Sequence, residues 1–170
     1  MTIGKIISGG QTGVDIAALR AARSAGIATG GWCPKNWMTE SGPQPERLKS
    51  FGLREHLSVK YPPRTRANVE EADGTLIIAA QLDDGSKLTA EYCRAMNKPM
   101  LHLERARIGV NHGEALEEAL AWLQRGRYGV VNVAGNRESK SPGIEREAED
   151  FLFRLFAAAT NTRKTSVYGS

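Results

Sequence analysis

Short apolar runs alternate with helical segments of roughly ten residues along most of this chain, and this alternation restricts its possible folds. Residues 74–80 are apolar on both faces, which is typical of a strand covered by helices on two sides. Similar strand-like runs occur at residues 5–8, 27–32, 99–103 and 130–135. Strands connected through helices form a parallel sheet with right-handed crossovers. We therefore expect an α/β fold with a doubly wound, mostly parallel sheet between two layers of helices.

The length of 170 residues fits one domain with a substantial core. We expect this domain to cover residues 1–159, while the polar residues 160–170 form a flexible C-terminal tail. Prolines and glycines interrupt the polar stretch at residues 33–63, which predicts a long irregular segment. Segments of this kind inside a small domain are usually functional or mobile.

The composition excludes several classes of protein. A net charge of +4 is mildly basic, which fits either attraction for anionic ligands or a simple surplus of surface Lys and Arg. Dense basic runs with interleaved aromatic residues are absent from the sequence, so we expect no nucleic-acid partner. No apolar stretch approaches the roughly 20 residues that span a bilayer, and no secretory leader is visible. We therefore expect a cytoplasmic protein without a membrane partner.

The two cysteines, Cys33 and Cys93, lie far apart in the sequence and form no metal-spaced pair. The three histidines also lack the spacing of a metal site. We therefore expect neither a disulfide framework nor a bound metal ion.

A glycine-rich turn follows the first strand and leads directly into an alanine-rich helix. Its glycines, Gly9, Gly10 and Gly13, match neither the dinucleotide fingerprint nor the Walker P-loop. Free N–H groups at a helix N-terminus beside glycines nevertheless suit a phosphate or another oxyanion. Thr12 can donate a hydrogen bond to a phosphate oxygen, and Asp15 can hold a ribose hydroxyl. The alternatives are that Asp15 only complements the helix dipole and that the glycines only allow tight packing.

Two further turns after strands carry small and polar residues. Ser86 and Thr89 lie on one face of the helix that follows residues 74–80, although Ser86 also suits an ordinary helix cap. The third turn, residues 135–143, contains a carboxylate, two cations and two hydroxyls. There Glu138 is a candidate acid or base, and the alternative is a polar surface loop.

Weaker candidates lie outside these three turns. Trp32 can stack on a flat ring and Lys35 can pair with an oxyanion, but Trp32 is equally suited to the core. Arg64 and Arg66 can contact phosphate, yet arginines that open a helix are more often solvated.

Five segments in order along residues 3 to 156 make the chain resemble the molybdenum carrier family. They are SGGQTGVD (residues 8–15), TGGWCPK (29–35), GP with PER (42–43 and 45–47), RTRANV (64–69) and NVAGNRES (132–139). That family resembles a circularly permuted branch of a Rossmann-like nucleotide-binding superfamily, which includes lonely-guy-type phosphoribohydrolases and molybdenum-cofactor carriers. The resemblance implies a three-layer Rossmann-like fold and a ligand such as molybdenum cofactor (molybdopterin), a pterin with a phosphate, or a nucleotide. It also implies a homo-oligomer, a dimer or tetramer.

The chain departs from its hydrolase relatives at the second turn. Those relatives carry Pro-Gly-Gly-x-Gly-Thr-x-x-Glu, whereas residues 84–91 contain one glycine and keep Thr89 and, offset, Glu91. The resemblance therefore favours a binding protein for a phosphorylated, nucleotide-like or pterin ligand. The alternatives are a phosphoribohydrolase-like enzyme that cleaves the N-glycosidic bond of nucleoside monophosphates, with Glu138 or Glu91 as catalytic residue, and a nucleotide-ligand sensor without catalysis.

The turns, the weaker candidates and the resemblance together give one set of expected ligand-binding residues. The set is Gly9, Gly10, Gln11, Thr12, Gly13, Asp15, Trp32, Lys35, Gly85, Ser86, Thr89, Gly135, Asn136, Glu138 and Ser139.

Overall fold

A six-stranded sheet in the order β5-β2-β1-β8-β6-β7 forms the centre of the computed structural model, which describes residues 3–109 and 112–165. All neighbouring strands in this sheet are parallel. The strands are β1 (Lys5–Ile7), β2 (Ala28–Cys33), β5 (Leu53–Glu55), β6 (Gly74–Ala79), β7 (Met100–Glu104) and β8 (Val130–Gly135). The helices are α1 (Val14–Ser24), α2 (Pro45–Ser50), α3 (Tyr61–Glu71), α4 (Asp84–Ala95), α5 (Arg105–Ile108), α6 (Gly113–Gly126) and α7 (Ile144–Thr165).

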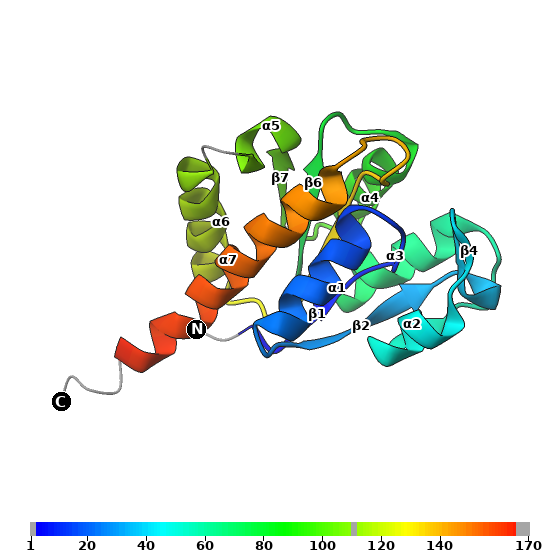
Figure 1. Cartoon of the computed structure of the whole chain (residues 1–170), viewed down its shortest axis with the longest axis horizontal. Helices are drawn as coiled ribbons and strands as arrows, with labels where there is room; N and C mark the ends of the chain where they lie inside the picture. Colours follow the sequence, from blue (N-terminus) through cyan, green and yellow to red (C-terminus); the bar gives the residue numbers. More distant parts are fainter. Residues whose placement is uncertain (1–2, 110–111, 166–170) are drawn as a thin grey trace.

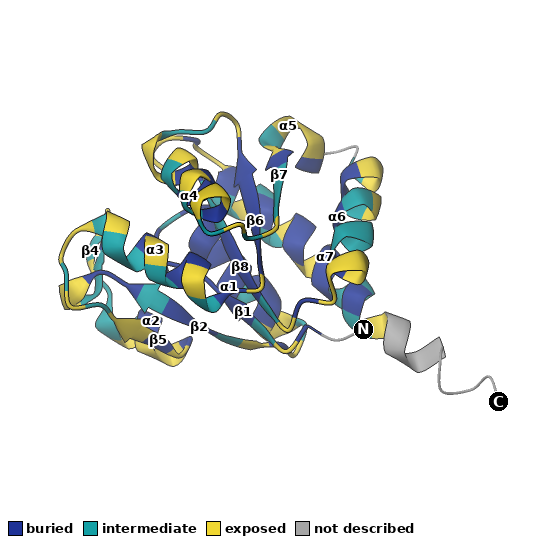
Figure 2. Ribbon diagram, turned by 180° about the vertical axis from the view of Figure 1, so that it is seen from behind, coloured by how far each residue is buried: buried dark blue, intermediate teal, exposed yellow. Residues whose placement is uncertain are grey.

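Helices cover both faces of the sheet (Figures 1 and 2). On one face α1, α6 and α7 bury their apolar sides against the strands, with Phe151 and Phe156 of α7 in the main core. On the other face α3 and α4 pack together, and Ala90 of α4 contacts Ile77 and Ala79 of β6. Every residue of β6 is buried, as expected for a strand between two helical layers. The expected three-layer, Rossmann-like α/β fold is confirmed.

The last strand in the sequence, β8, lies between β1 and β6 near the middle of the sheet. Asn132 of β8 is in register with Ile7 of β1 on one side and with Thr75 of β6 on the other. From β1 the chain moves outward to β2, whereas β6 begins the other half of the sheet. The order of strands therefore switches direction here, and the turns that follow β1, β8 and β6 meet at one edge. Ligands of doubly wound sheets bind at such a place.

The stretch expected to be irregular, residues 33–63, contains short elements instead. A 3₁₀ turn, η1 (Lys35–Trp37), leads into the two-stranded hairpin of β3 (Met38–Thr39) and β4 (Gly42–Pro43). Helix α2 and the edge strand β5 follow. Four of these five elements have only two or three residues. Such segments are too short to show a recognisable hydrophobic pattern in the sequence.

The C-terminal helix is longer than the sequence suggests. Helix α7 continues to Thr165, so the beginning of the expected tail at residues 160–170 is helical, and residues 166–170 lie outside the described part of the chain. The sequence also predicts a helix over residues 111–124; Asn111 lies outside the described part of the chain, and the structure has α6 at Gly113–Gly126. Among the described helices, none combines the length and the apolar character needed to cross a membrane.

Candidate functional site

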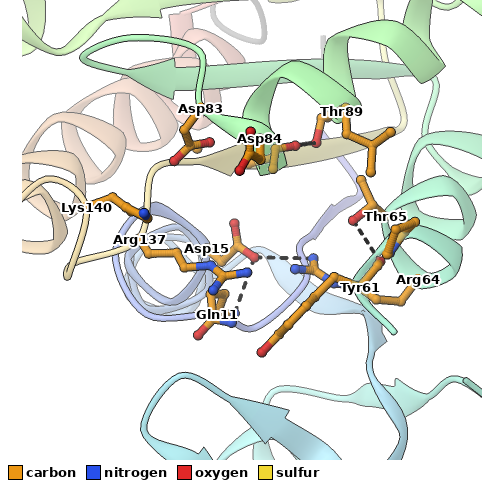
Figure 3. A pocket seen from close by; sticks show the side chains of 15 residues that line it. Gln11, Asp15, Tyr61, Arg64, Thr65, Asp83, Asp84, Thr89, Arg137 and Lys140 are labelled. Atoms are coloured by element: carbon orange, nitrogen blue, oxygen red, sulfur yellow. Dashed lines mark hydrogen bonds and ion pairs between the residues drawn. The ribbon is translucent and has the colours of Figure 1, made fainter. Parts of the chain in front are cut away.

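A cavity of about 510 Å³ lies where the turns after β1, β8 and β6 meet the beginning of α3 (Figure 3). The structure therefore brings the three sequence-predicted turns together. The residues that line the cavity are Gln11, Asp15, Tyr61, Pro62, Arg64, Thr65, Asp83, Asp84, Gly85, Leu88, Thr89, Ala134, Gly135, Arg137 and Lys140.

An ion pair between two buried side chains forms one wall of the cavity. Arg64 Nη1 lies 3.5 Å from Asp15 Oδ2, and the two side chains are 11% and 6% exposed. Asp15 Oδ2 also accepts a hydrogen bond of 3.2 Å from the Gln11 backbone N–H. A side chain at Gly9 would place its Cβ 1.5 Å from Arg64 Nη1, so only glycine leaves room for the guanidinium. Burial raises the pKa of Asp15, more than the Arg64 charge and the Gln11 N–H lower it.

Gln11 is 4% exposed, and its side-chain oxygen and nitrogen differ in their hydrogen bonding. Its Oε1 accepts hydrogen bonds from the backbone N–H groups of Thr12 (3.0 Å) and Glu40 (2.8 Å). Because both partners are donors, the orientation of the amide is fixed and Nε2 must be the donor on the other side. Gln11 Nε2 and Arg64 Nε are buried and have no hydrogen-bond partner among the described residues. The cavity wall thus contains two buried donors that lack an acceptor.

An aromatic ring flanked by cations lies at the start of α3. The Arg137 Cζ atom is 4.6 Å from the centre of the Tyr61 ring, and the Arg64 Cζ atom is 5.6 Å from it. Lys140 lines the cavity from the same turn as Arg137 (Figure 3). Positive charge and one aromatic surface therefore lie side by side in the cavity.

The beginning of α4 forms the opposite wall. Asp83 caps this helix, because its Oδ1 accepts the Ser86 N–H at 2.9 Å while the Ser86 hydroxyl accepts the Asp83 N–H at 2.8 Å. Burial acts to raise the pKa of Asp83, but the hydrogen bonds from Ser86 and Asn136 outweigh this effect. The pKa of Asp83 is therefore below its ordinary value. Thr89 lines the cavity and donates its hydroxyl hydrogen to the Gly85 carbonyl at 3.0 Å. The hydroxyls of the second turn therefore already have partners within the helix.

Asn136 was expected to bind ligand, but the structure makes it the connection between the turns. Its Oδ1 accepts the Ala80 N–H at 2.7 Å, and its Nδ2 donates to the Gln81 carbonyl at 3.1 Å and to Asp83 Oδ2 at 2.8 Å. Its own carbonyl accepts the Val14 N–H at 3.2 Å. These bonds join the turn after β8 to the turns after β6 and β1.

The N-terminus of α1 does not present free donors, although the sequence suggested an anion site there. The Thr12 N–H bonds to Gln11, the Gly13 N–H bonds to Glu145 Oε2 at 3.0 Å, and the Val14 N–H bonds to the Asn136 carbonyl. With the Gln11 N–H on Asp15, each N–H from residue 11 to residue 14 has an acceptor within the protein. Side chains rather than this helix end supply the unpaired donors of the cavity.

Three of the expected glycines allow close packing. A Cβ at Gly13 would lie 2.3 Å from the Asn136 carbonyl oxygen, and one at Gly135 would lie 2.0 Å from a carbonyl oxygen of β6. A Cβ at Gly10 would lie 2.7 Å from side-chain atoms of Leu48 and Leu53. These three glycines therefore allow tight packing, which is the alternative to anion binding that the sequence left open.

Two predicted residues, one in β2 and one shortly after it, lie outside the cavity lining. Trp32 donates from Nε1 to Glu71 Oε2 at 3.0 Å, and Arg54 covers its ring with Cζ 4.1 Å from the ring centre. Lys35 is exposed on η1. Neither residue is part of the cavity lining, although the β3–β4 hairpin farther along the chain contacts the turns after β1 and β8.

Both candidate catalytic glutamates also lie outside the cavity lining. Glu91 is exposed on α4. Glu138 accepts hydrogen bonds from the backbone N–H groups of Gly143 and Glu145 and so stabilises the start of α7. Ser139 is exposed and bonds to Glu40. Neither glutamate is placed to act on a molecule inside the cavity.

Sequence reasoning missed Tyr61, gave Arg64 only as a weaker candidate, and counted Arg137 and Lys140 as the cations of the third turn without naming them as ligand-binding residues. One signal was present, because the prolines after Tyr61 place Arg64 in the first turn of a helix. The order of the strands in the sheet decides which strand ends lie next to the start of α3. That order could not be predicted from the sequence.

Comparisons with known proteins agree with this geometry. The model of the circularly permutated YpsA SLOG family matches residues 6–156. The chain is also similar to a protein from Syntrophus aciditrophicus SB that is named "Putative molybdenum carrier protein", with a crystal structure at 1.45 Å resolution. The two are 39% identical, and the match covers 91% of this chain and 94% of that one with a TM-score of 0.83. A comparison with the curated proteins returned no match.

Proposed function

Because the chain belongs to the circularly permutated YpsA SLOG family, we propose that its cavity binds and carries a phosphorylated small molecule with a flat ring. The main support is the pair of buried donors, Gln11 Nε2 and Arg64 Nε, that have no partner among the described residues. A buried donor without an acceptor costs about 1–3 kcal/mol. An anionic group in the cavity would supply acceptors for both.

The charges of the cavity support an anionic ligand. Asp15 is paired with Arg64 and Asp83 caps α4, so each carboxylate has a partner of its own, while the charge of Arg137 acts to lower the pKa of both. Arg137 and Lys140 form no ion pair with any residue in the described ranges. A guanidinium and an ammonium group at one side of a cavity suit phosphate oxygens.

Tyr61 supports a flat ring next to the anionic group. Arg137 already lies over the Tyr61 ring, which indicates that this ring surface can be contacted by a planar group. A pterin or a nucleobase would stack on such a surface, while its phosphate lay near Arg137 and Lys140.

A molybdenum cargo, as suggested by the name of the Syntrophus protein, would be carried as an anion. Within the described ranges, no group of three His, Cys, Asp or Glu side chains is placed to hold a metal ion, and both cysteines are buried. The amide, guanidinium and ammonium donors of the cavity fit the phosphate of a pterin cofactor or an oxyanion such as molybdate. We therefore propose molybdenum cofactor as one member of the ligand class, bound through its phosphate.

Native mass spectrometry of freshly purified protein would weigh a co-purified ligand directly. Isothermal titration with AMP as probe then tests the cavity: Arg137→Gln is expected to weaken binding about tenfold or more, the scale of one charge-assisted hydrogen bond. Arg94→Gln removes an exposed arginine of α4 outside the cavity lining and should leave the affinity unchanged. Equal affinity of all three proteins for AMP would contradict the proposal.

An enzymatic function is the second candidate, and Asp15 is the observation in its favour. A carboxyl whose pKa is raised by burial inside a cavity is a candidate general acid. In N-glycosidic hydrolysis water adds to the sugar carbon C1′, the C1′–N bond breaks, and the leaving base takes up a proton. Release of free adenine from AMP, abolished by Asp15→Asn, would establish this function; bound AMP that stays intact would exclude it for this substrate.

The expected homo-oligomer remains a prediction. Analytical ultracentrifugation of the purified protein would distinguish a monomer from a dimer or tetramer.

A further inference from the structure

The tip of the β3–β4 hairpin places a carboxylate next to the cavity. Glu40 accepts hydrogen bonds from the hydroxyls of Thr12 and Ser139, and from the Ser139 backbone N–H at 3.3 Å. Thr12 belongs to the turn after β1, and Ser139 belongs to the turn after β8. Three donors from two separate turns therefore converge on one carboxylate.

We propose that Thr12 and Ser139 form an oxyanion subsite of the cavity, which Glu40 occupies until a phosphate group of the ligand replaces its carboxylate. Thr12 follows Gln11 directly and Ser139 precedes Lys140, and both of these neighbours line the cavity. Thr12 and Ser139 do not line the cavity themselves, but each is the chain neighbour of a residue that does. This inference deepens the proposed function and rests on it.

The electrostatics of the subsite favour a negative charge. Partial burial raises the pKa of Glu40, but hydrogen bonds from Ser139 and Thr12 together with the charge of Arg137 outweigh this effect and lower it. Hydroxyl and backbone N–H donors near an arginine are the groups that hold phosphate oxygens in proteins. The donors that stabilise the Glu40 carboxylate would serve a phosphate equally well.

The buried Gln11 side chain independently links this subsite to a ligand. Its Oε1 accepts the Glu40 N–H, so the hairpin fixes the orientation of the amide. Its Nε2 is buried in the cavity wall and has no partner among the described residues. The same amide therefore bonds to the hairpin through its oxygen, and its nitrogen is a buried donor without a partner among the described residues.

Displacing the Glu40 carboxylate from Thr12 and Ser139 costs little free energy, because Glu40 is exposed at the hairpin tip. Its carboxylate can move into water, where it recovers its hydration, while the donors on Thr12 and Ser139 remain in place. Glu40 then acts as an intramolecular competitor that weakens the binding of every external anion at this subsite.

Inorganic phosphate is the probe that tests this inference, with affinities measured by isothermal titration. Glu40→Ala is expected to bind phosphate about tenfold more tightly than the unmodified protein, because a charged competitor for the three donors is removed. Adding Ser139→Ala or Thr12→Ala to this variant should reverse the gain. Glu91→Ala removes the same charge from an exposed position of α4 and is expected to have no effect.

Three results would overturn the inference: no gain with Glu40→Ala, an equal gain with Glu91→Ala, or a gain that survives the loss of both hydroxyls. If AMP binds through Tyr61 and Arg137 with the same affinity in the unmodified protein and in Glu40→Ala, the proposed function stands and the subsite fails. If phosphate binding increases in Glu40→Ala and depends on Ser139, but AMP binds to none of the proteins, the subsite stands and the proposed function fails.

Discussion

Replacing Asn136 with alanine should destabilise the whole fold, although both of its chain neighbours line the cavity. Its side chain is buried and makes two neutral hydrogen bonds, with Ala80 and Gln81, and one with the Asp83 carboxylate. A neutral hydrogen bond contributes about 0.5–1.5 kcal/mol, and one to a charged group about 1.5–3 kcal/mol. Asn136→Ala should therefore lower the free energy of unfolding by about 3–5 kcal/mol, a large fraction of the 5–15 kcal/mol typical of a domain.

Urea denaturation followed by circular dichroism measures this loss, and the midpoint of thermal unfolding should fall by about 10 °C. Gln124→Ala removes an exposed amide of α6 and is the matched control, with an expected change within about 0.5 kcal/mol. A loss below about 1 kcal/mol for Asn136→Ala would refute the reasoning that this residue holds the three turns together.

Asn136→Asp sharpens the test because it keeps the shape of the side chain. The oxygen that accepts the Ala80 N–H is retained, but the donor that faces Asp83 Oδ2 at 2.8 Å becomes a carboxylate oxygen. Two carboxylates at this separation cannot both stay ionised without a large cost. The variant should be less stable than Asn136→Ala at neutral pH and should recover as the pH falls; a pH-independent difference would contradict the charge argument.

Three further predictions follow from the same contacts. Gly13→Ala should cost more than about 1 kcal/mol, because Gly13 has a φ of 79° and its new Cβ would lie 2.3 Å from a carbonyl oxygen; an unchanged thermal midpoint would contradict this. The lowered pKa of Asp83 stabilises the fold above its ordinary value of 3.8, and this stabilisation disappears as the pH falls through the lower folded-state pKa. The stability difference between the unmodified protein and Asp83→Asn should therefore shrink below about pH 4, which acid titration of the unfolding midpoint checks. Glu138→Gln should lower stability by about 1 kcal/mol through the start of α7 but leave AMP affinity unchanged; weaker AMP binding at full stability would place Glu138 in the site.

Long periodic elements of this fold could be predicted from the sequence, and the short ones could not. Residues 130–135 were expected as a strand and form β8 with those bounds, because three of the six residues are β-branched valines and the run ends at a glycine. Strand β5 and the β3–β4 hairpin were missed, since two or three residues carry no periodic signal. Their existence depends on pairing with distant parts of the chain.

The candidate site, like the fold, could be predicted only in part from the sequence. The glycine-rich and hydroxyl-rich turns could be recognised because turns after buried strands must meet at the carboxyl edge of a parallel sheet. The roles of individual residues could not be recognised. Asn136 is bound to the turn after β6 and Glu138 to the start of α7, and only the folded arrangement shows that their polar atoms already have partners.

By itself, the sequence determined the fold class and the three turns that form the cavity, because hydrophobic period and turn chemistry are local properties. The tertiary structure decided what faces the cavity. The opening turn has its N–H groups bonded within the protein, whereas Arg64 from α3 reaches the space that Gly9 leaves free. Thr12 and Ser139 meet at the Glu40 carboxylate because β8 lies beside β1 in the sheet. Contacts between residues far apart in the chain depend on strand order, and the local pattern of residues does not encode that order.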